Sequence, residues 1–246
     1  KIKIGVLVIS LIILLSLSIK TINQNKIWNS VYRIWSNTIH VSPRAYGAYN
    51  NLAIECLDED KFDEAIKHLK FALNANPPAN QEATLRTTLA TIYIEKKDFD
   101  QAIQELSRAV KLNPNMSEPY VNLGNAYCMK QQLDLGLRQY KKAIEMNPNS
   151  FEAHFNLGLF YYQKKEYNLA IQELKQAIYL KPELYSIDLY LAECYAKKGF
   201  SKEAIKAYKT ALAKLPSQES HFIYYDRGII YGKIGYPRAI GEFNKA

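Results

Sequence analysis

Asparagine side chains recur at related places along this sequence. Asn122 and Asn156 lie 34 residues apart, Asn51 precedes them in a similar context, and Asn125 adds a further amide. An amide can donate a hydrogen bond to a peptide backbone and accept one from it at the same time. A line of amides could therefore hold an extended peptide with little regard for its side chains. The alternative is that each amide bonds locally, within its own pair of helices.

Residues that could do covalent chemistry show no comparable order. The histidines are scattered along the chain: His40, His68, His154 and His221. The sequence contains no phosphate-binding loop, no cluster with metal-ligand spacing and no nucleophile paired with a base. We therefore expect no enzymatic activity, no cofactor and no bound metal ion from this chain.

The distribution of charge points away from nucleic acid as a partner. The 246 residues carry a net charge of +8, from 32 basic and 24 acidic side chains. Residues 1–43 contain five basic residues and no acidic one, so the rest of the chain is close to balanced. Nucleic-acid-binding proteins usually show a clustered basic face, and no part of the remaining sequence has one. Other proteins are the expected partners.

A unit of 34 residues is repeated from Ser117 onward. The first copy reads SEPYVNLGNAYCMKQQLDLGLRQYKKAIEMNPNS, and the next begins at Phe151. Four features recur at the same spacing: Leu123-Gly124 as Leu157-Gly158, Tyr127 as Tyr161, Ala143 as Ala177, and Pro148 as Pro182. This period and pattern resemble the tetratricopeptide repeat (TPR). The resemblance implies an all-α fold, in which paired antiparallel helices stack into a right-handed superhelix.

The same pattern divides the chain into three predicted parts. Residues 46–246 form a TPR solenoid of five full repeats and a partial sixth, which starts near His221. Residues 23–45 form a half-repeat or linker helix, and residues 1–22 a transmembrane helix. Gly136 stands where the third repeat would usually have alanine. Glycine costs about 1 kcal/mol in a helix interior, and we expect it to permit a closer approach of two helices.

The resemblance also implies a binding groove, because the first helices of TPR units line the concave surface. The side chains expected to face a bound peptide come from the first helices of repeats 1 to 5. They are Asn51, Thr87, Thr91, Asn122, Asn125, Phe155, Asn156, Tyr162 and Tyr190.

The N-terminal segment is strongly apolar. Residues 4–19 contain no charged residue, and their flanks bring the segment to about 20 residues, the length that spans a bilayer. The alternatives are a buried helix and a signal peptide. Interfacial lysine and aromatic residues often flank a span. The expected membrane-interface residues are Lys20, Trp28, Tyr32 and Trp35.

The junction after this segment resembles a more specific family, the GT-C membrane glycosyltransferases that carry C-terminal TPRs and are similar to protein O-mannosyltransferases. The matching residues are Lys20, Thr21, Asn25, Trp28, Trp35, Thr38, Ile39, Ser42, Pro43, Ala48, Tyr49, Asn51, Leu52 and Ala53. In that family the catalytic acids lie in loops between earlier membrane helices, so no catalytic residue carries over. The chain begins with Lys1 rather than Met, and we expect it to continue a longer protein.

Two functions remain from the sequence alone. The first is a membrane-anchored TPR scaffold with a single span, whose groove binds extended or helical segments of other proteins. The second is the acceptor-presenting region of a GT-C glycosyltransferase. Basic residues after the apolar segment weakly favour a cytoplasmic C-terminal side, whereas the family resemblance implies an extracytoplasmic or periplasmic one, which we favour.

Overall fold

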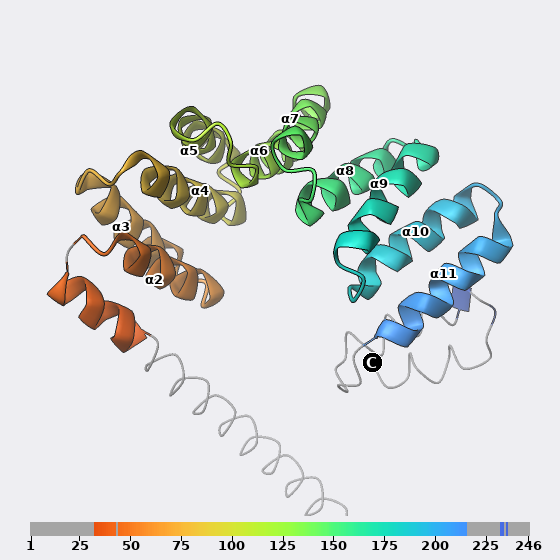
Figure 1. The fold of residues 1–246 in the computed structure, drawn as a ribbon, viewed down its shortest axis with the longest axis horizontal. Coiled ribbons are helices and arrows are strands. Elements are labelled where there is room, and N and C mark those ends of the chain that lie inside the picture. Colours follow the sequence, from red (N-terminus) through yellow and green to blue (C-terminus); the bar gives the residue numbers. More distant parts are fainter. Residues whose placement is uncertain (1–31, 43, 216–231, 234, 236–246) are drawn as a thin grey trace, which may run out of the picture. The chain divides into compact units, whose positions relative to one another are not determined.

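The computed structural model describes residues 32–42, 44–215, 232, 233 and 235. Residues 32–41 are helical, and ten further helices follow (Figure 1). Their bounds are α2 Tyr46–Asp58, α3 Phe62–Asn74, α4 Ala79–Glu95, α5 Phe99–Leu112, α6 Glu118–Met129, α7 Leu133–Met146, α8 Phe151–Gln163, α9 Tyr167–Leu180, α10 Tyr185–Lys197 and α11 Ser201–Lys214. The described residues contain no strand, and the all-α prediction is confirmed.

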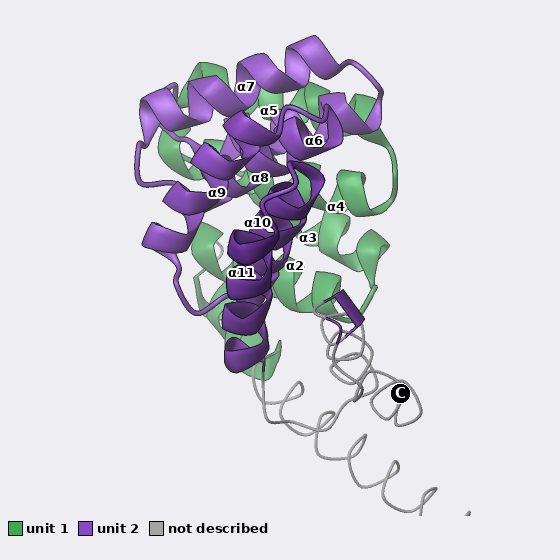
Figure 2. Ribbon diagram, turned by 90° about the vertical axis from the view of Figure 1, so that its right-hand side faces the viewer, with its two compact units in different colours: residues 1–113 green, residues 114–246 purple. Residues whose placement is uncertain are grey.

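The helices pack as consecutive pairs within two compact units, residues 1–113 and residues 114–246 (Figure 2). In unit 1, α2 packs on α3 and α4 on α5, and in unit 2 the pairs are α6–α7, α8–α9 and α10–α11. Inside each unit, the second helix of a pair also contacts the first helix of the next pair, and successive first helices contact one another. Each helix pair therefore buries its apolar faces against its neighbours, as in a solenoid.

Small residues form the contacts between paired helices. In the α4–α5 pair, Ala90, Ala102 and Ala109 are fully buried, and Leu106 fills the space beside them. In the α6–α7 pair the approach is closer still. A Cβ atom on Gly136 would lie 2.4 Å from Sγ of Cys128 and 3.1 Å from the carbonyl oxygen of Gly124. The close approach expected at Gly136 is therefore present, and a methyl group there would collide with Cys128.

The five described first helices, α2, α4, α6, α8 and α10, end in the same way. The residue after each C-cap has a positive φ, and the next backbone N–H bonds back to a carbonyl oxygen five residues earlier, as in a Schellman motif. The bonds are Lys61 to Cys56 (2.8 Å), Asp98 to Tyr93 (2.8 Å), Gln132 to Tyr127 (2.9 Å), Glu166 to Tyr161 (2.9 Å) and Phe200 to Tyr195 (2.9 Å). At these five turns, glycine occupies the positive-φ place only at Gly199; the others are Asp60, Lys97, Gln131 and Lys165.

The N-terminal predictions need correction. The longest described helix, α4, has 17 residues, several of them polar, whereas a span needs about 20 apolar residues. No helix in the described ranges is long and apolar enough to cross a membrane, so the described structure does not support the assignment as a single-span membrane protein. The segment 1–22, Lys20, Trp28 and the predicted sixth repeat from His221 fall outside the described residues, apart from Lys233 and two neighbours.

Tyr32 and Trp35, the other two residues expected at a membrane interface, lie on the described helix at residues 32–41. Both are half-buried. Ile39 of the same helix packs against the core of α2 and α3, together with Leu57 and Phe62. The described part of this segment is thus packed on unit 1, and the structure gives no reason to place its aromatic residues at a bilayer.

The positive-φ residues generate a stability prediction. A non-glycine residue in the left-handed region carries strain of about 1–2 kcal/mol, and glycine removes it at a smaller cost in unfolded-state entropy. Lys165→Gly is expected to raise the free energy of unfolding by about 0.5–1 kcal/mol, measured by urea denaturation. Lys164→Gly is the matched control, since Lys164 has φ −74° and the same charge. A loss of stability in both variants would contradict the prediction.

Candidate functional site

Five aromatic side chains in unit 2 form a continuous row of contacts. The ring of Phe151 stacks on that of Phe155 at 5.7 Å, and Phe155 meets Tyr190 edge to face at 6.0 Å. Tyr190 then meets Tyr162 at 5.7 Å, and Tyr162 lies 6.1 Å from Tyr167. We call Phe151, Phe155, Tyr190, Tyr162 and Tyr167 the aromatic row. All five side chains are half-buried, so each ring leaves part of its surface in solvent.

The helical repeat explains how the row is assembled. Phe151, Phe155 and Tyr162 are four and seven residues apart on α8, so they share one face of that helix. Tyr190 projects from α10, which contacts α8 directly, and Tyr167 begins α9. Paired rings gain about 0.5–1.5 kcal/mol beyond their buried area. The rings therefore hold one another in place before any ligand arrives.

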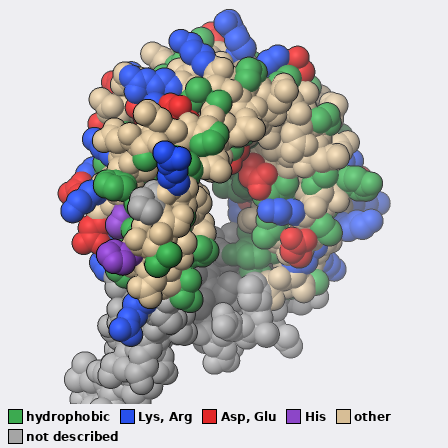
Figure 3. Space-filling view, turned by 60° about the vertical axis from the view of Figure 1, so that its left-hand side comes forward, with side chains coloured by type: hydrophobic (Ala, Val, Ile, Leu, Met, Phe, Trp, Pro, Cys, Tyr) green, Lys and Arg blue, Asp and Glu red, His purple; other side chains and the backbone are tan. Residues whose placement is uncertain are grey.

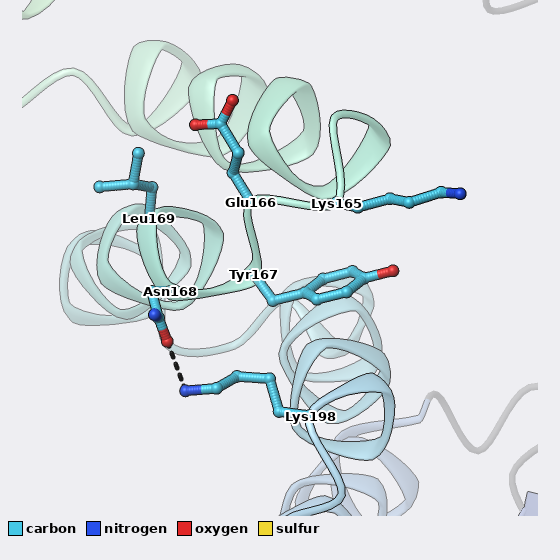
Figure 4. Close-up of a pocket in the computed structure, with 6 residues that line it drawn as sticks. All are labelled: Lys165, Glu166, Tyr167, Asn168, Leu169 and Lys198. Carbon is cyan, nitrogen blue, oxygen red and sulfur yellow. Dashed lines mark hydrogen bonds between the residues drawn. The ribbon is translucent and has the colours of Figure 1, made fainter.

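Charged groups flank the row at both ends. Nζ of Lys181 lies 4.5 Å from the ring centre of Phe151 and 3.5 Å from Oε1 of Glu152. At the other end, Tyr167 borders a cleft of about 350 Å³ between the start of α9 and the end of α10 (Figure 4). The cleft is lined by Lys165, Glu166, Tyr167, Asn168, Leu169 and Lys198.

Asn125, one of the amides expected in the groove, is held by a structural partner. The hydroxyl of Tyr140 on α7 donates to Oδ1 of Asn125 at 2.7 Å. Two repeat periods later, the hydroxyl of Tyr208 donates to Oε1 of Glu193 at 2.6 Å. Burial is the main cause that raises the pKa of the Tyr208 hydroxyl, and the neighbouring Glu193 raises it further. In both pairs a buried phenol needs an acceptor, and the first helix supplies it.

The intervening pair of helices shows the alternative solution. In α8–α9, the equivalent places are taken by Leu159 and Leu174, and neither carries a polar atom on its side chain. A Cβ atom on Gly158 would lie 2.9 Å from Cγ of Leu174. In unit 2, a buried tyrosine in the second helix therefore comes with a polar residue 15 positions earlier, and the leucine that replaces it in α9 comes with a leucine. This pairing is readable in the sequence, but the expectation for Asn125 did not use it.

Glu193 illustrates the electrostatics of such a pair. Burial alone would raise the pKa of this carboxyl, but hydrogen bonds from Tyr208 and Lys233 outweigh burial and lower it. Nζ of Lys233 lies 3.1 Å from Oε1 of Glu193. The ionised carboxylate is therefore committed to contacts inside the protein.

Two threonines expected in the groove use their hydroxyls within their own helix. Thr87 is only 1% exposed, and its hydroxyl donates to the carbonyl oxygen of Ala83 at 2.8 Å. Thr87 is therefore a core residue, and its assignment to the binding surface is wrong. The hydroxyl of Thr91 donates to the carbonyl oxygen of Thr87 at 3.2 Å, which engages it within its own helix. Bonding to a carbonyl four residues earlier is a common fate of threonine and serine side chains in helices.

The remaining predicted residues lie on first helices. Asn122 on α6 and Asn156 on α8 are half-buried at equivalent places, on two helices in contact. Asn51 on α2 lines a small cleft of about 170 Å³ in unit 1, beside Gln81 and Thr84 of α4. Phe155, Tyr162 and Tyr190 join the aromatic row, whereas the sequence reasoning missed Phe151 and Tyr167. The signal for Phe151 was its spacing of four residues from Phe155 on one helix, whereas Tyr167 begins the next helix and no helical spacing indicated it.

His154, one of the scattered histidines, serves as a link within the fold. It is buried, with Nδ1 2.7 Å from Oε2 of Glu173 and Nε2 3.0 Å from the carbonyl oxygen of Pro148. In unit 1 the same relative positions hold Arg86 and Glu105, joined at 2.5 Å. These polar pairs connect the first helix to the second. On the face seen in Figure 3, basic side chains are interspersed with acidic and apolar ones.

The arrangement of stacked antiparallel helix pairs, with small residues at their contacts, defines a helical-repeat protein of the TPR class. Three family models agree with this: a tetratricopeptide-repeat model matches residues 57–123, a TPR-repeat model residues 124–165, and a further tetratricopeptide-repeat model residues 151–184. The chain therefore contains tetratricopeptide repeats.

Solved structures of other TPR proteins resemble this chain. The MamA protein is 27% identical with a TM-score of 0.56, over 70% of this chain and 92% of that one. TTC0263, a TPR protein of Thermus thermophilus, is 24% identical with a TM-score of 0.62, over 77% and 99%. YrrB, described as a TPR protein with an unusual peptide-binding site, is 19% identical with a TM-score of 0.52, over 75% and 93%. The last two likenesses show the fold alone.

Comparison with curated proteins found no match. The proposed link to the GT-C glycosyltransferases is not shown by any of the matches above, all of which concern the repeats.

The Asn125–Tyr140 contact generates a prediction of coupling. Asn125→Ala leaves the buried Tyr140 hydroxyl without its acceptor, which is expected to lower the free energy of unfolding by about 1–3 kcal/mol. In a Tyr140→Phe background the hydroxyl is gone, so the same substitution should cost about 1 kcal/mol less. Urea denaturation of the four variants measures this coupling. Asn156→Ala serves as the control, with no coupling to Tyr140→Phe. Additive effects of Asn125→Ala and Tyr140→Phe would contradict the structural role.

Proposed function

We propose that this protein is an interaction scaffold that binds an extended or helical segment of a partner protein across the aromatic row of unit 2. The observation that carries this proposal is the row itself: five half-buried rings, in unbroken mutual contact, on adjoining helices of one unit. A contiguous exposed apolar surface of this kind marks an interaction site more often than scattered apolar residues do.

The chemistry of the rings suits protein recognition. Tyrosine is enriched among the residues that dominate binding energy at interfaces, and three of the five rings carry a phenol that can meet a partner's polar groups. Burial, followed by the charge of Glu193, raises the pKa of Tyr162, so its hydroxyl remains neutral and able to donate. Because the rings are already held by one another, binding immobilises few side chains and costs less entropy.

Amides next to the row would supply contacts to a peptide backbone. Asn156 follows Phe155 on α8 and is half-buried, and Asn122 occupies the equivalent place on α6. Such amides would hold the main chain of the bound segment, while the rings take its apolar side chains. Fold likeness to YrrB, which is described as having a peptide-binding site, is consistent with this use of the scaffold. Neither membrane anchoring nor a glycosyltransferase role enters the proposal.

A peptide selection tests the proposal. Peptides selected from a displayed random library against the full chain are measured by fluorescence anisotropy on the parent protein and on Phe155→Ala and Tyr190→Ala. Each variant is expected to bind about tenfold or more weakly, because a central aromatic anchor is worth about 2 kcal/mol or more. Tyr179→Ala is the matched control, since Tyr179 lies on α9 outside the row and is 82% exposed.

The folded state of each variant is checked by its thermal melting curve. Unchanged affinity in both row variants, or an equal loss in Tyr179→Ala, would rule out the aromatic row as the binding surface.

A further inference from the structure

Four lysines gather where the last two described helix pairs of unit 2 turn. Lys164 and Lys165 follow α8, and Lys197 and Lys198 close α10. Two large apolar side chains lie beside them, Leu169 with 41% of its surface exposed and Phe200 with 45%. We call these six residues the lysine edge. It combines positive charge with exposed apolar surface, a pairing that fold stability alone does not call for.

Contacts between the two turns show that the edge is continuous. Nζ of Lys198 donates to Oδ1 of Asn168 at the start of α9 (Figure 4). The same Nζ lies 4.5 Å from the ring centre of Phe200. The end of α10 is thus joined to the start of α9, and the cleft of about 350 Å³ lies between them, with Tyr167 and Leu169 as its apolar wall.

The charges of this edge lack counter-charges. Within the described part of the chain, none of its four lysines forms an ion pair with a carboxylate, whereas Lys142 pairs with Glu145 at 2.9 Å and Lys214 pairs with Asp188. The cleft lining contains a single carboxylate, Glu166. Glu193, which feels the charge of Lys197, already accepts from Tyr208 and pairs with Lys233.

In unit 1, the equivalent lysine has its charge neutralised by a carboxylate. There Lys96, the C-cap residue of α4, reaches Asp63, the second residue of α3, with Nζ 2.7 Å from Oδ1. In unit 2 the C-cap residue of α10, Lys198, reaches the second residue of α9, which is Asn168. Asparagine holds the lysine in place by a hydrogen bond but leaves its charge uncompensated. The site is therefore suited to a negative charge from outside.

We propose that the lysine edge docks an acidic segment of a partner protein, with carboxylates against Lys165 and Lys198 and one apolar side chain in the cleft beside Leu169. Complementary charge gives such contacts their specificity and a fast association that weakens with salt. The exposed leucine and phenylalanine favour a peptide that offers apolar side chains over a nucleic-acid backbone. Tyr167 is the one residue of the aromatic row that also borders this cleft, so the two sites can be tested separately.

The probe is a labelled synthetic peptide of about a dozen residues, made of Asp and Glu with a single central Leu, at an ionic strength where the Debye length is about 10 Å. Its affinity for the full chain is measured by fluorescence anisotropy. Lys165→Glu/Lys198→Glu is expected to bind it about tenfold or more weakly, since every 1.4 kcal/mol is tenfold. Lys141→Glu/Lys209→Glu is the matched control, with the same change in net charge on exposed lysines of α7 and α11.

Further variants and a neutral peptide test whether charge drives the binding. Lys165→Gln/Lys198→Gln removes the two charges without reversing them and should also weaken binding of the acidic peptide. This variant keeps the test valid if Lys165→Glu/Lys198→Glu fails to fold. A peptide with Asn and Gln in place of the acids should lose affinity, and Phe155→Ala/Tyr190→Ala should leave acidic-peptide binding unchanged, which separates failure here from failure of the aromatic row.

An equal loss of peptide affinity in Lys165→Glu/Lys198→Glu and in the control variant would overturn the proposal, because binding would then depend only on the net charge of the protein. Equal binding of the neutral peptide would also overturn it. So would tighter binding of an oligonucleotide or of anionic vesicles than of the peptide, with the same dependence on Lys165 and Lys198.

Discussion

Close contact between helix backbones is the constraint on which the rest of this structure depends. A Cβ atom on Gly124 would lie 2.4 Å from Cε1 of Tyr140, and one on Gly136 the same distance from Sγ of Cys128. Where the contact residue is alanine, as at Ala53, Ala102 and Ala177, it is completely buried. Large apolar side chains such as Leu106 and Leu174 fill the rest of the space inside a pair. Phe151, Phe155 and Tyr162 lie on another face of α8, where they remain half-buried.

The two proposed surfaces follow from the same repeat geometry in different ways. The aromatic row depends on contact between first helices, because Tyr190 of α10 bridges Phe155 and Tyr162 of α8. The lysine edge depends on the turns, whose left-handed residues place Lys165 and Gly199 at equivalent points. Each surface is built by adjacent repeats together, so neither would exist in a single helix pair. A partner with an acidic stretch next to apolar anchors would fit both.

The sequence predicted the helices well because the 34-residue period reports directly on packing. Leu, Ala and Gly at fixed places are dictated by the space inside each pair, so the pattern of residues carries the fold. Side-chain hydrogen bonds were harder to predict. Thr87 turned out to be buried, since its hydroxyl can bond to Ala83 within the helix, and Asn125 was already occupied by Tyr140. The aromatic row was partly predicted: Phe155, Tyr162 and Tyr190 were expected, and Phe151 could have been found from its spacing on α8. The contact of Tyr167, on the next helix, needed the three-dimensional structure. The membrane assignment rested on apolar composition in residues 1–22, and no described helix supports it.

The central claim is that the aromatic row is a preformed binding surface. The NMR signals of its rings during a peptide titration test this claim most directly. In a protein carrying carbon-13-labelled phenylalanine and tyrosine rings, titration with a selected peptide should shift the signals of Phe155, Tyr162 and Tyr190 together. Tyr179, outside the row and almost fully exposed, should not move. Shifts confined to rings outside the row, with Phe155 and Tyr190 unchanged at saturation, would contradict the account.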